Sequence, residues 1–209
     1  MCTRYYMEMS PELKPYVDEA KRSALGKSMI IVLGKPLKTE GEIRPTDMVP
    51  VIAPNKKRKA MVFPMVWGFD IKGLDRPVLN ARVETAKDKA SFRDAWKMRR
   101  CIIPASYYFE WDHNKNKYAI QPPGASVTYL AGLYQMQEYR GLNYPVFTVL
   151  TREPSEELSK IHDRMPLILP ETAIGDWINP DGKPEEVVNT ALTEMIAEKE
   201  NKYEQLTFQ

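Results

Sequence analysis

The clearest indication of architecture is the segment Arg100-Cys-Ile-Ile-Pro-Ala-Ser-Tyr-Tyr-Phe-Glu-Trp111. Its two halves, Cys101–Pro104 and Tyr107–Trp111, are short and rich in β-branched and aromatic residues, which favour strands. Similar short apolar runs recur along the chain, at Met48–Ala53, Ala60–Trp67, Tyr118–Gln121, Thr128–Tyr134, Val146–Leu150 and Leu167–Leu169. The sequence therefore predicts a protein built mainly from short strands.

Helical periodicity is confined to a few segments. Apolar residues recur at three- and four-residue steps after Pro11, which predicts a helix as far as about Ala24. The apolar run Ser28–Leu33 is either a strand or the end of a buried helix. Further helices are expected at Lys89–Arg99, from Pro154 onward, at Glu171–Trp177 and, as a longer amphipathic helix, at Glu185–Glu198.

Together these elements predict an α+β fold with a curved, mostly antiparallel β-sheet or barrel-like core and flanking helices. A length of 209 residues suits one domain, residues 1–209, with a hydrophobic core of its own. Strict alternation of strands and helices is absent, and so are glycine-rich phosphate-binding motifs. A Rossmann or P-loop nucleotide-binding fold is therefore disfavoured.

The composition, with 43% hydrophobic and 28% charged residues, is that of an ordinary globular protein. The longest apolar run, Met29–Leu33, is too short to cross a bilayer, and the first residues lack an export signal, so no membrane partner is expected. Two cysteines favour a reducing cytoplasm, with association to the nucleoid if the source is bacterial. The scattered Cys2, Cys101, His113 and His162 do not form a metal-binding pattern, so no metal or cofactor is expected.

The charge is unevenly distributed along the chain. Residues 1–105 carry 21 Lys and Arg against 12 Asp and Glu, whereas residues 106–209 carry 9 against 16. The basic half is a candidate surface for an anionic ligand. The run Lys56-Lys57-Arg58-Lys59 is more typical of a solvated turn, whereas the second basic cluster, Arg82–Arg100, also contains Phe92 and Trp96.

Cys2 is the first candidate for chemistry. If the initiator Met1 is removed, Cys2 carries an α-amine and a thiol on adjacent carbons. The pKa of the amine is about 8 and the pKa of the thiol is about 8.5. The amine can condense with an aldehyde to an imine, and the thiol can then close a five-membered thiazolidine ring. The alternative is that Cys2 is a small hydrophobic residue at a frayed terminus.

Asn80, Arg82 and Glu84 form a second candidate group. In an extended segment, residues two apart point to the same face, so an amide, a cation and a carboxylate would line up. The alternative is that these three side chains lie on the solvent-exposed face of an ordinary strand.

Glu110 and His162 are candidates for proton transfer. Glu110 stands between Phe109 and Trp111, and desolvation among aromatic residues would raise the pKa of its carboxyl toward neutrality. His162 is flanked by an acidic and a basic residue, Asp163 and Arg164. An outward-facing glutamate and a structural histidine are the alternatives.

Trp67 is a candidate for binding unpaired bases. Together with Phe69 it could stack on bases of a single strand, although burial in a core is the commoner place for such residues.

The order of these motifs is more specific than any one of them. The motifs occur in this order along the chain: Cys2 with Arg4, Trp67-Gly68, Asn80-Ala-Arg-Val-Glu-Thr85, Phe92-Arg93, Arg100-Cys-Ile-Ile-Pro-Ala105, Phe109-Glu110-Trp111 and Ile161-His-Asp-Arg-Met-Pro166. This set resembles the SOS-response-associated peptidase (SRAP) family of abasic-site-processing proteins, over roughly residues 1–170. Thr3 is a departure, because members of that family usually have glycine after the cysteine.

The resemblance implies a protein that binds single-stranded DNA containing abasic sites and forms a covalent thiazolidine with the ring-opened sugar through Cys2. It implies that Asn80 orients Cys2 and that Glu110 and His162 move protons. It further implies removal of Met1 by autoproteolysis and a lyase activity through the imine. By the same resemblance, DNA contacts are made by Arg4, Trp67, Arg82 and Arg164.

Two other functional classes remain open at this stage. The chain could be a non-catalytic single-stranded DNA-binding module that uses only its basic half and its aromatic residues. It could also be an amino-terminal-nucleophile hydrolase, a peptidase or amidohydrolase, in which Cys2 attacks a carbonyl and its own amine acts as the base.

Overall fold

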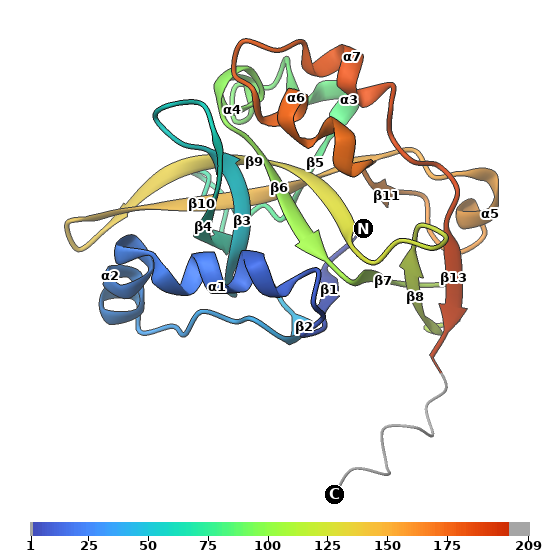
Figure 1. Ribbon diagram of the computed structural model, residues 1–209. Helices are drawn as coiled ribbons and strands as arrows, with labels where there is room; N and C mark the ends of the chain where they lie inside the picture. Colours follow the sequence, from blue (N-terminus) through green and yellow to red (C-terminus); the bar gives the residue numbers. More distant parts are fainter. Residues whose placement is uncertain (1, 201–209) are drawn as a thin grey trace, which may run out of the picture.

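Five strands of the computed structural model, which describes residues 2–200, close into a barrel (Figure 1). Their order around the barrel is β10-β4-β3-β6-β9, and β9 pairs back with β10 to complete the ring. All of these pairings are antiparallel except that of β4 with β10. The strands are β3 Met48–Pro54, β4 Ala60–Trp67, β6 Arg100–Ala105, β9 Thr128–Tyr139 and β10 Leu142–Arg152.

A second, antiparallel sheet has the order β13-β8-β7-β1-β2. Ser106 joins it to the barrel: its amide donates to the carbonyl of Tyr6, and its own carbonyl accepts from the Thr128 hydroxyl. The segment 100–111 thus supplies one strand to each sheet. The strands are β1 Arg4–Met7, β2 Gly41–Ile43, β7 Tyr107–Trp111, β8 Lys117–Gln121 and β13 Ile196–Lys199.

Three very short strands extend the barrel strands at one end. β5 (Asn80–Arg82) and β11 (Met165–Pro166) both pair with the last residues of β10, and β12 (Ile168–Leu169) pairs with β9. These pairings bring residues near positions 80, 150 and 165 together, although they are far apart in the sequence.

Helices cover the barrel on two sides. In Figure 1, α1 and α2 lie below it, whereas α3, α4, α6 and α7 gather above it. The helices are α1 Lys14–Arg22, α2 Ala24–Leu33, α3 Val83–Ala86, α4 Arg93–Met98, α5 Glu156–Ser159, the 3-10 turn η1 Glu171–Ala173, α6 Ile174–Ile178 and α7 Pro184–Val188. None of the helices within residues 2–200 is long and apolar enough to cross a membrane.

Alternate residues of the barrel strands face two separate apolar clusters. Val49 and Val51 of β3 pack in the inner cluster with Trp67 and Phe147, while Ile52 faces the outer cluster beneath the helices. Because both faces are buried, the strands are nearly continuous apolar runs, and this is why the sequence pattern indicated them.

Arg100 fastens the upper helices to the barrel. Its side chain is buried and donates hydrogen bonds to the carbonyls of Trp96, Lys97, Trp177 and Asn179. A buried guanidinium is tolerated only when its donors are satisfied, and these four carbonyls belong to α4 and to the end of α6.

The structure confirms the α+β class with a barrel-like core. Of the two alternatives for Ser28–Leu33, the helix end is right: the segment is the second part of α2, with Met29 buried but Ile31 82% exposed. The amphipathic helix expected at Glu185–Glu198 is wrong: α7 ends at Val188, and Ile196–Lys199 form β13 instead. Pairing with β8, which local periodicity does not reveal, outweighs helix propensity there.

Gly132 of β9 provides a test of the barrel closure. A Cβ atom at this position would lie 2.7 Å from the Thr148 carbonyl oxygen and 2.7 Å from Ile103 Cδ1. Gly132→Ala should lower the free energy of unfolding by about 1–3 kcal/mol, measured by chemical denaturation. The matched control is Gly175→Ala in α6, where a Cβ meets nothing within 4 Å, and it should be neutral or stabilising. An equal effect of the two substitutions would contradict the close approach of β9 to β10.

Candidate active site around Cys2

Cys2 is completely buried at the end of the barrel where β5 joins β10. Its thiol donates to the Arg4 carbonyl oxygen, with an S–O distance of 3.5 Å. Burial, together with the nearby charge of Glu110, raises the pKa of the Cys2 thiol far above its usual range. The resting thiol is therefore protonated, and it needs a base before it can act as a nucleophile.

Asn80 holds the backbone of Cys2. Its side-chain amide donates to the Cys2 carbonyl oxygen at 2.9 Å. The segment before Asn80 is itself fixed, because the Leu79 carbonyl accepts from the Trp67 indole at 3.1 Å and from the Val149 amide at 2.9 Å. The pairing of β5 with β10 thus positions Asn80, and Asn80 positions Cys2.

Glu110 lies close enough to Cys2 for its charge to act on the thiol, and His162 lies next to Glu110. Glu110 Oε2 is 4.0 Å from His162 Nε2, and the Glu110 side chain comes from the buried face of β7. Burial raises the pKa of the Glu110 carboxyl to about 7. A carboxyl with this pKa exchanges protons readily at neutral pH.

His162 has a partner for either protonation state. Its Nδ1 accepts a hydrogen bond from the Arg164 amide at 3.1 Å, and the same atom lies 2.7 Å from the Asp163 carboxylate. Burial lowers the pKa of His162, which favours the neutral ring that accepts from the amide. When protonated, the ring can instead donate to Asp163, so the pair suits proton transfer.

Two tyrosines near Cys2 did not emerge from the sequence reasoning. Tyr5 and Tyr108 face each other across β1 and β7, are fully buried, and have hydroxyls without a hydrogen-bond partner among residues 2–200. Burial raises the pKa of both hydroxyls, and the charge of Asp47 adds to the effect at Tyr5, that of Glu110 at Tyr108. The spacing of Tyr108 and Glu110 on one face of a strand was the signal that could have revealed Tyr108.

Arg82 is exposed at the edge of this site. Asn80 and Arg82 stand on either side of the buried Ala81 in β5, as the alternation predicts. Glu84 does not continue this face, because α3 begins at Val83, and that part of the expectation is wrong. The Arg82 side chain makes no hydrogen bond or ion pair within the described part of the chain.

Arg164 does not have the place expected of a DNA-binding residue. It is 9% exposed, and its Nη2 lies 2.8–2.9 Å from both carboxylate oxygens of Glu84 and 2.8 Å from the Thr151 carbonyl oxygen. Burial would raise the pKa of Glu84, but the hydrogen bond from Arg164 holds it below its usual value. Arg164 therefore fastens the segment that carries His162 to α3 and β10.

Trp67 does not have the place expected of a base-stacking residue either. Its side chain is fully buried, stacks on Phe147 with a centroid distance of 6.0 Å and lies 5.4 Å from the Tyr5 ring. It presents no ring face to solvent. Its contribution to the site is the hydrogen bond to Leu79 that supports Asn80.

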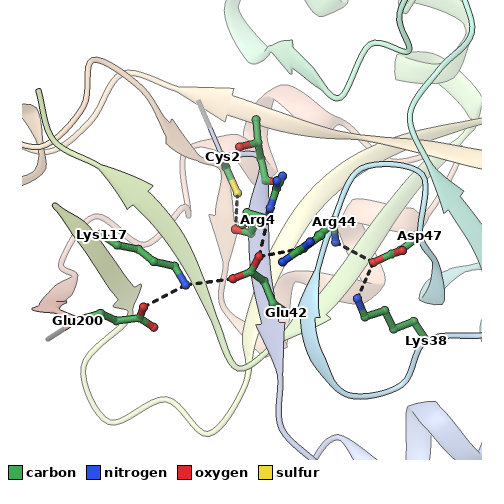
Figure 2. Close-up of polar contacts among 9 residues, drawn as sticks. Cys2, Arg4, Lys38, Glu42, Arg44, Asp47, Lys117 and Glu200 are labelled. Carbon is green, nitrogen blue, oxygen red and sulfur yellow. Dashed lines mark hydrogen bonds and ion pairs between the residues drawn. The ribbon is translucent and has the colours of Figure 1, made fainter. Parts of the chain in front are cut away.

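Arg4 belongs to an ion-pair network on the outer face of the second sheet (Figure 2). Glu42 is the centre of this network, with one carboxylate oxygen 3.3 Å from Arg4 Nε and 3.1 Å from Arg44 Nε, and the other 3.0 Å from Lys117 Nζ. Lys117 also pairs with Glu200. Three cations therefore share one central carboxylate.

Residues 2–200 hold no group of three or more His, Cys, Asp and Glu side chains that could bind a metal ion.

The sequence profile of the SOS response associated peptidase (SRAP) family matches residues 1–207. The chain belongs to the SRAP family. It is 34% identical over 133 residues to the "Abasic site processing protein YoaM" of Bacillus subtilis, a match that covers 60% of this chain and 57% of that protein. It is 30% identical over 122 residues to the "Abasic site processing protein YedK" of Escherichia coli, covering 56% of this chain and 55% of that protein. The chain thus spans little more than half the length of each of these two relatives.

Solved structures share the fold. A crystal structure of a protein from Bacteroides thetaiotaomicron superposes with a TM-score of 0.75 at 22% identity, covering 96% of this chain and 93% of that one. A crystal structure of a protein from Bordetella bronchiseptica gives a TM-score of 0.71 at 21% identity, covering 96% of this chain and all of that one. At these identities the likeness concerns the architecture alone.

The burial of Glu110 predicts a specific pH dependence of stability. Its pKa is about 7 in the folded protein and about 4.5 in a model peptide, so the folded state binds its proton more tightly. The resulting stabilisation is fully present below about pH 4.5 and is lost as the pH rises through 7, by at most about 3 kcal/mol. Denaturation curves from pH 4 to pH 8 should show this loss in the wild type relative to Glu110→Gln.

Glu84→Gln is the matched control for that experiment. The pKa of Glu84 is lowered in the fold, so its contribution is present above the unfolded pKa and is lost as the pH falls. The two substitutions should therefore shift the pH profile in opposite directions. Parallel profiles for the wild type and Glu110→Gln would contradict the buried, proton-binding carboxyl.

Proposed function

We propose that this SRAP protein processes abasic sites in single-stranded DNA by covalent capture on Cys2. The observation that carries the proposal is the convergence of Cys2, Asn80, Glu110 and His162 at one end of the barrel. The names of its curated relatives, which are abasic site processing proteins, supply the substrate class. Arg82, exposed beside these groups, supplies a cation for a phosphate.

The proposal requires a free α-amine on Cys2. Met1 lies outside the described residues, and its removal by autoproteolysis belongs to the proposal. The chain described here still carries Met1, so the burial of Cys2 is that of the unprocessed protein. After removal, amine and thiol stand on adjacent carbons, and the hydrogen bond from Asn80 to the Cys2 carbonyl keeps them in place.

The capture reaction proceeds in two steps. The Cys2 amine adds to the aldehyde carbon of the ring-opened sugar, and loss of one water gives an imine. The thiol then adds to the imine carbon while its proton passes to the nitrogen, which closes a thiazolidine ring. Glu110, whose pKa is about 7, can protonate the departing hydroxyl and accept the thiol proton.

His162 is the second group that handles protons. Its Nε2 faces Glu110 and its Nδ1 is held by the Arg164 amide. It can exchange protons with Glu110 during imine formation and return a proton when the ring reopens. The imine also acidifies the neighbouring sugar carbon, and removal of that proton with expulsion of the 3′ phosphate is the proposed lyase activity.

The decisive test is intact mass spectrometry after incubation with an oligonucleotide that contains one abasic site. The processed wild type should lack Met1 and gain the mass of the strand minus one water. Cys2→Ala should form no thiazolidine, whereas Cys101→Ala, which removes the thiol buried in the barrel, should form the adduct.

Other outcomes would reject covalent capture. If the wild type without Met1 forms no adduct, the mechanism is wrong. A stable acyl-enzyme on Cys2 with a model amide, and no response to DNA, would identify an amino-terminal-nucleophile hydrolase. If Cys2→Ala binds single strands as tightly as the wild type and keeps the protein's function, the chain is a non-catalytic binding module.

Arg82 should act as a phosphate contact. Arg82→Ala should weaken binding to single strands of any sequence and reduce the slope of log K against log salt by about 0.7. Fluorescence anisotropy at several salt concentrations measures both quantities. The control is Arg22→Ala, which removes an exposed arginine at the end of α1. Unchanged binding with a loss of crosslinking alone would show that Arg82 does not contact phosphate.

A further inference from the structure

A cavity of about 740 Å³ lies at the end of the barrel away from Cys2. Pro145 at the start of β10 lines it, whereas Val149 near the other end of β10 pairs with Asn80 beside Cys2. Four residues of strand separate these positions, about 14 Å. The buried Trp67 and Phe147 fill the barrel between the two ends. The cavity is therefore separate from the candidate active site.

The walls of the cavity are apolar and adaptable. Met61, Phe63 and Met65 of β4 form one side, and Tyr134 and Met136 of β9 form another. Met65 is buried, whereas Met61 and Met136 are 39% and 51% exposed at the opening. Methionine side chains adjust to ligands of different shape, and a cavity of this volume is of the size that holds a small organic molecule.

The rim of the cavity is basic. Lys56, Lys57 and Arg99 line it, and no aspartate or glutamate is among its lining residues in the described part of the chain. None of these three cations forms an ion pair within residues 2–200. Arg58, in the same turn as the lysines, differs because it pairs with Asp181.

Arg99 is the feature that points to a ligand. Its guanidinium lines the cavity and forms no hydrogen bond or ion pair with another described residue, although only its Nε is fully buried. Its backbone is fixed, because its amide donates to Ala95 and its carbonyl accepts from the Tyr134 amide, both at 2.8 Å. The two outer nitrogens of the guanidinium are therefore left to an acceptor from outside the chain, and a carboxylate is the acceptor that best matches them.

We propose that this end of the barrel binds a small organic acid with an apolar body, a medium-chain carboxylate. The carboxylate pairs with Arg99 at the rim, with Lys56 and Lys57 adding positive charge, and the apolar body fills the space between Phe63, Met65 and Tyr134. A DNA strand fits less well, because only the rim is charged and the interior is apolar. This inference is independent of the function proposed for Cys2.

Isothermal titration calorimetry of the full chain with decanoate, below its micellar concentration, tests the proposal. The wild type should bind one equivalent, and decanol, which has the same chain without the charge, should bind at least tenfold more weakly. Arg99→Gln should weaken decanoate binding at least tenfold. The matched control, Arg93→Gln, removes an exposed arginine of α4 that does not line the cavity and should bind within twofold of the wild type.

A second variant tests the proposal in case Arg99→Gln does not fold. Met61→Glu places a carboxylate at the partly exposed opening and should also weaken decanoate binding at least tenfold. Both variants should retain crosslinking by Cys2. A failure of the cavity proposal can therefore be distinguished from a failure of the function proposed for Cys2. Absence of saturable decanoate binding, equal binding of decanol, or indifference to both substitutions would overturn the proposal. Displacement of decanoate by an oligonucleotide, with loss of strand binding in Arg99→Gln, would assign the surface to DNA instead.

Discussion

β10 pairs along both of its edges, and this constraint determines the arrangement of the molecule. One edge pairs with β9, and the other pairs first with β4 and then, farther along, with β5. The first pairings close the barrel, and the last carries Asn80 to the backbone of Cys2. Gly132 allows β9 to approach β10 closely enough for this closure.

Burial gives the site its chemical character. Cys2 and Glu110 are enclosed together, so the pKa of the thiol and the pKa of the carboxyl both rise. A neutral thiol next to a carboxyl that titrates near pH 7 is suited to proton transfer rather than to a permanently charged nucleophile. His162, held between the Arg164 amide and Asp163, extends this system toward the surface.

Charged residues in this protein have structural as well as surface roles. Arg100 and Arg164 are largely buried and satisfy backbone carbonyls, which fastens helices and loops to the barrel. Arg4 shares the carboxylate of Glu42 with two other cations. Arg82 and Arg99 differ, because neither forms an ion pair among the described residues, and they lie at opposite ends of the barrel.

The sequence alone determined the strand-rich class, because strands buried on both faces are continuous apolar runs, and it singled out Cys2, Asn80, Glu110 and His162 by their motifs. Only the tertiary structure decided which of the remaining residues are accessible. In the structure, Trp67 is buried in the barrel and Arg164 pairs with Glu84. Residues 196–199 form a strand, where the sequence predicted a helix. Accessibility and strand pairing depend on contacts between residues far apart in the chain, and local sequence patterns do not encode them.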